Sequence, residues 1–323
     1  MNPDKAVEVL AWPSVIAIIV VAGMLIFRAA LAGAIGRRLR MKYGEDRVVT
    51  LERSMASHRY YARLYDEYLA RGLNRSFNPN DRENNLDTEA RRTHYFQVGG
   101  DALRIIIDGL IQGRYDPPET ILDFPSGSGR VTRHLRSYFP SARITACDLY
   151  DFHYEFCAAC FEIEGFKSKA NFDEIDFGKK FDLIFSGSLL THLPADQFVA
   201  ALRLISRSLS PRGMAVVTLH GRHVEYLHEH RWQFIEEERF GQAKVTVPSH
   251  GFGYVDYNDE LMRTWWYEQK HYGVTLSRPH WTLKQMESDY HVRIISYAER
   301  AWDNTQDVLI FGRPGVNEWD APT

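Results

Sequence analysis

Apolar residues between positions 121 and 219 follow two alternating patterns. Short continuous apolar runs are typical of strands buried on both faces of a parallel sheet. The longer segments between them have apolar positions three or four residues apart, as in helices that pack on one side. This alternation predicts a doubly wound α/β sheet. The predicted strands are residues 121–124, 144–147, 181–187 and 214–219, and the predicted helices are residues 131–139, 152–164 and 198–209.

Three further strands have less apolar patterns. Residues 169–172 follow the second predicted helix and predict a short third strand. Residues 292–298 and 307–311 are joined by a polar stretch at 300–306, and they predict two final strands.

Residues 9–27 form an uncharged apolar segment. At about 1.5 Å per residue, a helix of this length nearly spans the roughly 30 Å hydrocarbon core of a bilayer. The basic residues lie after the apolar run, which argues against a secretory signal and, by the positive-inside tendency, predicts a cytoplasmic C-terminal bulk. We therefore expect a single-pass anchor through residues 9–35. Two alternatives stay open: a signal cleaved near residues 30–32, or a helix docked on the protein itself.

The segment between the apolar run and the predicted sheet is polar and aromatic. Residues 43–72 have apolar and aromatic positions at helical spacing and predict a juxtamembrane helix. Residues 74–87 are polar and rich in asparagine, which predicts a loop. Residues 87–90 have the composition of a helix start, and residues 102–111 predict the apolar face of that helix.

A glycine loop and an acidic residue follow the first two predicted strands. At Gly127 and Gly129 the backbone can turn sharply and a ligand can approach without meeting a Cβ atom. Asp148 ends the second strand, so it lies at the same carboxyl edge of the sheet. A carboxylate there can accept hydrogen bonds from both hydroxyls of a ribose. The pair predicts a nucleoside site.

The glycine loop lacks the elements that bind phosphates. Thr132 stands where a dinucleotide loop has its third glycine, and there is no Gly-Lys-Ser/Thr sequence for a triphosphate. The nearby cation, Arg130, has neither the type nor the spacing of a phosphate-binding lysine. A cofactor with a ribose and no phosphate fits this loop better.

Three motifs together resemble the class I S-adenosylmethionine-dependent methyltransferase superfamily: DFPSGSG at residues 123–129, Asp148, and FDLIFSGS at residues 181–188. The resemblance covers residues 90–313. It implies a Rossmann-like, mostly parallel seven-stranded sheet with an antiparallel last strand, and S-adenosylmethionine as the cofactor. Pro125 replaces the first glycine of the superfamily's loop, so the loop must differ locally there.

The resemblance also implies which residues bind the cofactor. The fourth-strand motif borders the methionine moiety, and an acid beyond the third strand accepts the adenine amino group, for which Asp176 is preferred to Asp173 and Glu174. A helix before the first strand covers the cofactor, so Tyr95 and residues 99–100 are expected at its entrance. The expected binding residues are Asp123, Pro125, Ser126, Gly127, Gly129, Asp148, Leu149, Asp176, Ser186 and Gly187.

Two histidines follow strands at the carboxyl edge, where the cofactor is expected. Methyl transfer from a sulfonium depends mostly on positioning, but a hydroxyl acceptor also benefits from a base with a pKa near neutrality. His192 is the first candidate for this base and His220 the second. The alternative for each is a structural role in capping a helix or satisfying a loop.

Residues 220–280 interrupt the strand and helix alternation with a stretch dense in aromatic residues and histidines. Tyrosine and tryptophan faces are suited to stacking on sugar-like or other flat apolar surfaces, so this insertion is predicted to form the acceptor pocket. The histidines lack the tight spacing with carboxylates that a metal site requires, and no metal is expected.

Composition and charge argue against a nucleic acid partner and against a disulfide-stabilised protein. The net charge of −3 gives no basic footprint for nucleic acid, so no nucleic acid partner is expected. The three cysteines, Cys147, Cys157 and Cys160, form no disulfide framework and suit a reducing compartment.

These observations predict a membrane protein whose cytoplasmic catalytic domain transfers a methyl group to a small-molecule, glycan or lipid-linked acceptor. Two other readings remain: a nicotinamide-dependent oxidoreductase on a similar sheet, and a catalytically silent cofactor-binding scaffold. The expected division is an anchor at 1–36, a helical segment and loop at 37–87, a methyltransferase domain at 88–315 with the insertion at 220–280, and a tail at 316–323.

Overall fold

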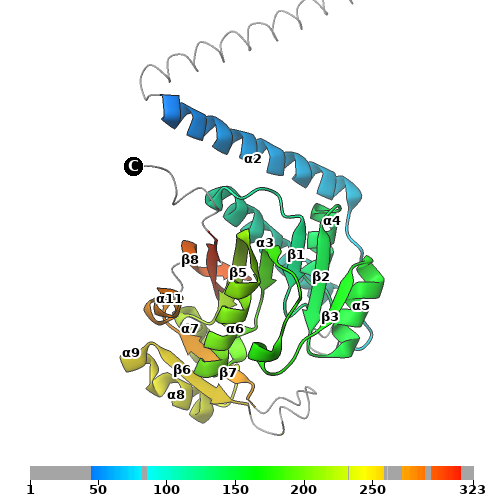
Figure 1. Cartoon of the computed structure of the whole chain (residues 1–323). Coiled ribbons are helices and arrows are strands. Elements are labelled where there is room, and N and C mark those ends of the chain that lie inside the picture. The colour runs from blue at the N-terminus through cyan, green and yellow to red at the C-terminus, as the bar shows by residue number, and fades with distance from the viewer. Residues whose placement is uncertain are drawn as a thin grey trace, which may run out of the picture. The chain divides into compact units, whose positions relative to one another are not determined.

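The computed structural model describes residues 45–81, 86–231, 233–257, 260, 271–287 and 292–313. Within them, seven strands form one sheet in the order β3-β2-β1-β4-β5-β9-β8 (Figure 1). Strands β1 to β5 are parallel, and β9 runs antiparallel to both of its neighbours, as the resemblance implied. The strands are β1 Thr120–Asp123, β2 Arg143–Asp148, β3 Glu164–Lys167, β4 Phe181–Ser186, β5 Leu209–Leu219, β8 Arg293–Trp302 and β9 Gln306–Gly312.

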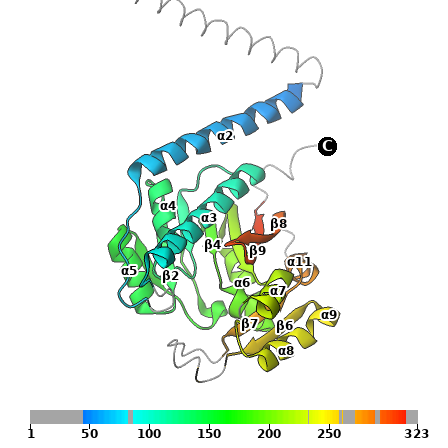
Figure 2. The ribbon, with the colours of Figure 1, turned by 180° about the vertical axis from the view of Figure 1, so that it is seen from behind.

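Helices cover both faces of the sheet. Helix α6 (Ala195–Ser208) packs its apolar side on one face, in a core that contains Phe198 and Ile205 (Figure 1). Helices α3 (Glu89–Gly113) and α4 (Thr132–Tyr138) pack on the other (Figure 2). Each face of a parallel sheet is thus buried, which explains the continuous apolar runs of β1, β2, β4 and β5.

The predicted third strand at residues 169–172 is wrong. Helix α5 (Asp151–Phe161) ends where Glu162 takes a left-handed conformation (φ 54°), and β3 follows at once. Strand β3 lies at the edge of the sheet and its side chains are mostly exposed, so it lacks the apolar run of a buried strand. The predicted residues instead lead into the short 3₁₀ helix η1 (Phe172–Glu174).

The stretch from residue 220 onward folds beside the sheet. It contains α7 (Arg222–His230), α8 (Glu237–Val245), α9 (Val247–His250) and an antiparallel pair of strands, β6 (Phe252–Asp256) and β7 (Gly273–Ser277). Val224, Phe240 and Leu276 belong to a small hydrophobic core of its own. Helix α11 (Pro279–Glu287) then precedes β8.

The predicted membrane segment at residues 9–27 lies outside the described residues. Among the residues that the structure does describe, no helix has the length and apolar character needed to cross a bilayer. Helix α2 (Glu45–Arg71) accounts for most of the helix predicted at residues 43–72. Its last turns contact α4, since the hydroxyl of Tyr138 donates to the carbonyl of Tyr61 over 2.7 Å and Tyr68 bonds His134 Nδ1 over 2.8 Å.

Candidate active site

The glycine loop and Asp148 meet at the carboxyl edge of the sheet. The backbone N–H of Gly127 donates to Oδ2 of Asp148 over 2.9 Å, and that of Tyr150 donates to Oδ1 over 3.1 Å. The N–H of Ser126 donates to the carbonyl of Cys147 over 2.9 Å and ties the loop to β2. Gly127 and Asp148 line the same pocket, so the predicted convergence of loop and acid is present.

The two glycines of the loop have different structural roles. Gly127 has φ +48°, and a Cβ atom there would meet nothing within 4 Å, because the position faces open space. Gly129 has φ +79°, and its Cβ atom would lie 2.4 Å from the ring of Phe161. Gly127 therefore keeps the pocket open, whereas Gly129 lets the loop pack closely on α5. Pro125 stands at the start of the turn after a cis peptide bond, and this is the local difference from a three-glycine loop.

Asp123 ends β1 at the base of the pocket. Its Oδ2 accepts a hydrogen bond of 2.6 Å from the hydroxyl of Thr132, the residue at the position of the absent third glycine. Burial raises the pKa of Asp123 to about 7, the bond from Thr132 opposes this rise, and the nearby charge of Asp148 adds to it. The pocket thus has one carboxyl group that titrates near neutrality and that a cation would ionise.

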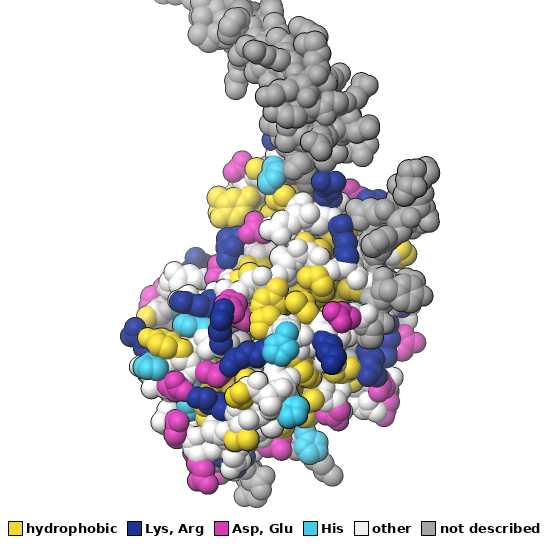
Figure 3. Space-filling view, turned by 90° about the vertical axis from the view of Figure 1, so that its left-hand side faces the viewer, with side chains coloured by type: hydrophobic (Ala, Val, Ile, Leu, Met, Phe, Trp, Pro, Cys, Tyr) yellow, Lys and Arg dark blue, Asp and Glu magenta, His cyan; other side chains and the backbone are white. Residues whose placement is uncertain are grey.

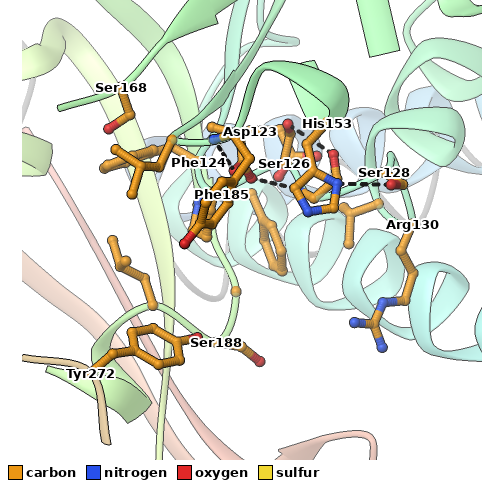
Figure 4. A pocket seen from close by; sticks show the side chains of 18 of the residues that line it. Asp123, Phe124, Ser126, Ser128, Arg130, His153, Ser168, Phe185, Ser188 and Tyr272 are labelled. Carbon is orange, nitrogen blue, oxygen red and sulfur yellow. Dashed lines mark hydrogen bonds between the residues drawn. The ribbon is translucent and has the colours of Figure 1, made fainter. Parts of the chain in front are cut away.

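The pocket between β1, β2 and β4 has apolar walls with polar groups at one side. The space that it encloses is about 1010 Å³ with its open mouth included. Asp123, Ser126 and His153 lie on one side, and Ser188 and Tyr272 lie across the opening (Figure 4). The apolar lining includes Leu149, Phe172, Phe185, Leu189 and Trp302.

A closed ring of hydrogen bonds fixes the pocket rim beyond β4. The N–H of Ser188 donates to the hydroxyl oxygen of Thr218 over 2.8 Å, and that hydroxyl donates to Oε1 of Gln306 over 2.6 Å. Nε2 of Gln306 then donates to Oγ of Ser188 over 2.8 Å. The ring holds Ser188 in a left-handed conformation (φ 57°) and links the ends of β4, β5 and β9.

The segment at residues 72–81 is fastened to the glycine loop by Arg133, which is 1% exposed. Its Nε donates to the carbonyl of Gly129 over 2.8 Å, and Nη2 donates to that of Ser128 over 3.2 Å. Its Nη1 donates to the carbonyls of Asn74 and Ser76, each over 3.0 Å. One buried guanidinium group therefore joins two segments that lie more than fifty residues apart in sequence.

A second connection joins the same segment to α5. Nδ2 of Asn78 donates to Oγ of Ser128 over 3.1 Å and to the carbonyl of Phe152 over 2.7 Å. Ser128 Oγ also bonds Nδ1 of His153 over 2.8 Å (Figure 4). The sequence motifs included Ser128 but singled out neither Asn78 nor His153, because the roles of these two depend on contacts across the fold.

Several predicted site residues lie outside the pocket lining. Gly129 faces Phe161 of α5 instead of the pocket. Ser186 is fully buried at the end of β4, and the next residue, Gly187, does line the pocket. Asp176 is exposed, and its Oδ1 accepts from the N–H of Gly178 over 2.9 Å in a turn. The structure does not bring Asp176 to the pocket. The lining there is instead Ser168, Lys169 and Phe172.

His192 lies one aromatic ring behind the pocket wall. It stacks on Tyr272, with ring centroids 4.6 Å apart and an angle of 22° between the planes, and Tyr272 lines the pocket. Its Nδ1 is 2.8 Å from the carbonyl oxygen of Gly273. A carbonyl only accepts, so the proton of neutral His192 is on Nδ1 and the lone pair is on Nε2. That tautomer can accept a proton through Nε2.

His220 is less suited to act as a base at neutral pH. It is buried, its Nδ1 has no hydrogen-bond partner among the described residues, and its ring centroid is 5.9 Å from that of His192. Burial lowers the pKa of His220 to about 3, and the neighbouring His192 acts in the same direction. A base is most effective with a pKa near the working pH, so the low pKa of His220 argues against it in this role.

The helix predicted to cover the site does approach the loop. The hydroxyl of Tyr95 on α3 donates to the carbonyl of Ser128 over 3.2 Å. A Cβ atom at Gly99 would lie 2.3 Å from the carbonyl oxygen of Arg130, so glycine permits this close contact. Tyr95 is buried under the loop and is not itself part of the pocket lining.

No group of three or more His, Cys, Asp or Glu side chains with the arrangement of a metal site occurs in the described part of the chain.

Comparison with known proteins supports the class of the domain. Residues 121–213, which contain the glycine loop, Asp148 and β4, match the family model described as a methyltransferase domain. These residues are therefore similar to a methyltransferase domain. This match confirms the superfamily predicted from the motifs and supports S-adenosylmethionine as its cofactor.

Solved structures with a similar fold share little sequence with this chain. They include an S-adenosylmethionine-dependent methyltransferase from Clostridium acetobutylicum ATCC 824, which has 12% identity, covers 73% of this chain and 96% of that chain, and has a TM-score of 0.45. DesVI from Streptomyces venezuelae has 13% identity, with 67% and 92% covered and a TM-score of 0.45. A TehB-like methyltransferase from Corynebacterium glutamicum ATCC 13032 Kitasato has 17% identity, with 69% and 95% covered and a TM-score of 0.41. No curated protein sequence gives a significant match.

Proposed function

We propose that this chain methylates a small-molecule, glycan or lipid-linked acceptor at the cytoplasmic face of a membrane, in which residues 9–35 anchor it. The observation that carries the catalytic part is the convergence of Gly127 and Asp148 on one pocket, with an open position at Gly127. The uncharged run at residues 9–27 and the basic residues after it support the anchor and its orientation.

The pocket residues fit S-adenosylmethionine. Asp148 lines the pocket, and a carboxylate has about four acceptor sites, so Asp148 would accept the ribose hydroxyls. Leu149 and Phe172 offer apolar surfaces for the adenine ring. Asp123 would be ionised by a positively charged ligand, which would gain a charge-assisted hydrogen bond or ion pair at the base of the pocket.

The chain's own residues would then position the acceptor. S-adenosylmethionine supplies an electrophilic methyl group on a sulfonium centre. Gly187 lets the pocket wall pack closely on the rings of Phe185 and Trp302, because a Cβ atom there would lie 2.8 Å from each ring. Ser188 and Tyr272 line the pocket on that side and restrict the approach of the acceptor. Such alignment of two reactants supplies much of the acceleration for a displacement of this kind.

For a hydroxyl acceptor, we propose His192 as the proton acceptor. Its Nε2 carries the lone pair because Nδ1 donates to the Gly273 carbonyl. Tyr272 lines the pocket, and its ring stacks on that of His192. Tyr272 is therefore proposed to set the distance at which the acceptor hydroxyl meets Nε2.

A calorimetric titration tests the cofactor site. We expect the full-length chain to bind S-adenosylmethionine and not NADH. Loss of the charge in Asp148→Asn should weaken binding roughly 10- to 100-fold, since a hydrogen bond to a charged group contributes about 1.5–3 kcal/mol. The matched control is Asp176→Asn, because Asp176 is an acid outside the pocket lining. Equal affinity of the two variants, or binding of NADH alone, would contradict the proposal.

Two further experiments test the acceptor and the anchor. Transfer of label from S-adenosylmethionine to lipid, glycan and small-molecule fractions identifies the acceptor, and labelling of none of them would favour the silent scaffold. Removal of residues 1–36 should move the protein from the membrane fraction to the soluble fraction while it keeps cofactor affinity. An intact mass that lacks the first thirty or so residues would instead indicate a cleaved signal.

A further inference from the structure

A second hollow lies beside the candidate active site. It is formed by α7 and by the turn between β8 and β9. Its lining residues are His223, Tyr226, Leu227, Arg231, Arg300, Asp303, Asn304 and Thr305.

The second hollow is at the same edge of the sheet as the cofactor pocket. Strand β9 is antiparallel to β5 and pairs Asp307 with Leu219, so the turn before β9 lies at the carboxyl end of β5. Trp302 lines the first pocket, and the next residue, Asp303, lines the second. Burial raises the pKa of Asp303, and the charges of His94 and of Arg130, a residue of the first pocket, oppose this rise. The two hollows are therefore neighbours within reach of electrostatic interaction.

The lining of the second hollow favours an anion. Arg231 and Arg300 have no carboxylate within ion-pair distance in the described part of the chain. Nη2 of Arg300 donates to Oδ1 of Asn304 over 2.9 Å, which orients its guanidinium group. The acid in the lining, Asp303, is 3.3 Å from Nε2 of His94. Guanidinium groups match the geometry of phosphate and carboxylate oxygens.

Tyr226 presents a neutral donor next to these arginines. Its ring stacks between His223 and His230, at centroid distances of 5.8 and 4.4 Å and angles of 16° and 17° between planes. The two histidines come three residues before and four residues after it, on one side of α7. Tyr226 is 48% exposed. This exposed side chain carries a hydroxyl that can donate to an anion.

We propose that the second hollow binds an anionic group of the acceptor, a phosphate or a carboxylate, while the acceptor's reactive atom reaches the first pocket past Trp302. The acceptor role rests on the proposed methyl transfer; the anion site itself does not. Charged side chains of both signs are interspersed over the face in Figure 3. A general positive charge of this face would therefore not explain the binding of an anion. The specificity comes from Arg231, Arg300 and Tyr226 lining one hollow.

Protection of arginines from phenylglyoxal tests this site on the full-length chain. Inorganic phosphate is the first probe, acetate the second, and chloride at equal ionic strength the control. For a dissociation constant on the order of 1 mM, about 10 mM phosphate should slow modification of Arg231 and Arg300 roughly tenfold. Arg212, which is exposed and pairs with Asp116, is the internal control and should react at an unchanged rate. Peptide mass spectrometry gives the rate for each arginine.

The protection pattern distinguishes a phosphate site, a carboxylate site and the absence of an anion site. Protection by phosphate indicates a phosphorylated acceptor, and protection by acetate alone indicates a carboxylate. Absence of protection by both, or equal protection of Arg212, would overturn the inference. Arg300→Gln should abolish protection of Arg231, whereas Arg212→Gln should leave it unchanged. The conservative Arg300→Lys variant keeps the charge and should retain partial protection.

Cofactor binding measured on the same samples separates this inference from the proposed function. S-adenosylmethionine affinity should stay within about twofold in the presence of phosphate and in Arg300→Gln, because the two hollows are distinct. Displacement of S-adenosylmethionine by phosphate would place the anion in the first pocket and overturn the inference. If S-adenosylmethionine fails to bind while phosphate still protects both arginines, the proposed function fails and the anion site stands.

Discussion

The hydroxyl of Thr132 donates to Oδ2 of Asp123 over 2.6 Å, and both residues are buried. This contact accounts for the departure from a dinucleotide loop, because a threonine takes the place of the third glycine and its hydroxyl engages the acid at the end of β1. Asp123 is also near the charge of Asp148, which raises its pKa, and near that of Arg130, which lowers it by less than burial raises it. A carboxyl group in that setting binds its proton more tightly than one in water.

Asp123 should therefore make the stability of the protein fall as pH rises. Its pKa is raised from 3.8 to about 7 in the folded state, so between these values the folded state holds more protons than the unfolded state. The free energy of unfolding then decreases with pH over this window, by at most about 1.4 kcal/mol per unit of pKa difference.

Urea unfolding between pH 4 and pH 7 checks this. In Asp123→Asn the free energy of unfolding should decrease less with pH than in the unmodified protein. The difference between the variant and the unmodified protein should therefore increase steadily from pH 4 to pH 7. Asp173→Asn, at an exposed acid on η1, serves as the control and should keep the original slope. Parallel curves for the unmodified protein and Asp123→Asn would refute the assignment.

The two glycines of the loop should respond differently to alanine. Gly129→Ala combines a left-handed backbone with a clash against Phe161, and we expect a loss of about 3 kcal/mol in the free energy of unfolding. Gly127→Ala should cost only about 1 kcal/mol, because its Cβ atom meets open space. That methyl group would project toward the cofactor, so affinity for S-adenosylmethionine should fall at least about tenfold. Denaturant titration and calorimetry separate the two effects.

Arg133 should be needed for the attachment of residues 72–81. Arg133→Met leaves four carbonyls without their charged donor and should lower the free energy of unfolding by about 3 kcal/mol. Hydrogen exchange should rise in residues 72–81 and in the glycine loop. The control is Arg136→Met on the same helix, whose exposed side chain bonds the carbonyl of Pro140. Equal effects of the two variants would exclude a specific role for Arg133.

With an acceptor identified by label transfer, His192 can be tested as the base. His192→Asn should lower kcat about 10²- to 10⁴-fold and remove the acidic limb of the profile of kcat against pH. S-adenosylmethionine affinity should change little, since His192 is outside the pocket lining. His220→Asn should leave the profile unchanged, because the pKa of His220 is about 3 and it does not titrate near neutrality. A normal profile in His192→Asn would rule out the proposed role.

Most of the sheet could be predicted from local sequence because its central strands are buried on both faces. β1, β2, β4 and β5 appear as continuous apolar runs for that reason. Strand β3 escaped prediction because it lies at an edge with exposed side chains, where no periodic apolar signal is required. Gly165 within it pairs with Ala146 of β2, so its place depends on a tertiary contact.

Some residues of the candidate site could also be predicted from local sequence, and others could not. Gly127 and Asp148 could be predicted because glycine and a carboxylate at adjacent strand ends are required by backbone geometry and by ribose chemistry. Asp176 was preferred among the acids beyond the expected third strand, but its Oδ1 accepts from the N–H of Gly178 in a turn instead. Asn78 and His153 were missed because their roles arise where distant segments meet at Ser128.

Trp302 gives this protein an optical reporter of its own. Its indole is 4% exposed, donates from Nε1 to the carbonyl of Val98 over 2.9 Å and packs against Gly187 at the pocket wall. Fluorescence from so sheltered a ring should be blue-shifted and should change when the adjacent space fills. Quenching that vanishes in Trp302→Phe would allow ligand entry to be followed in real time, without a label and before any product is known.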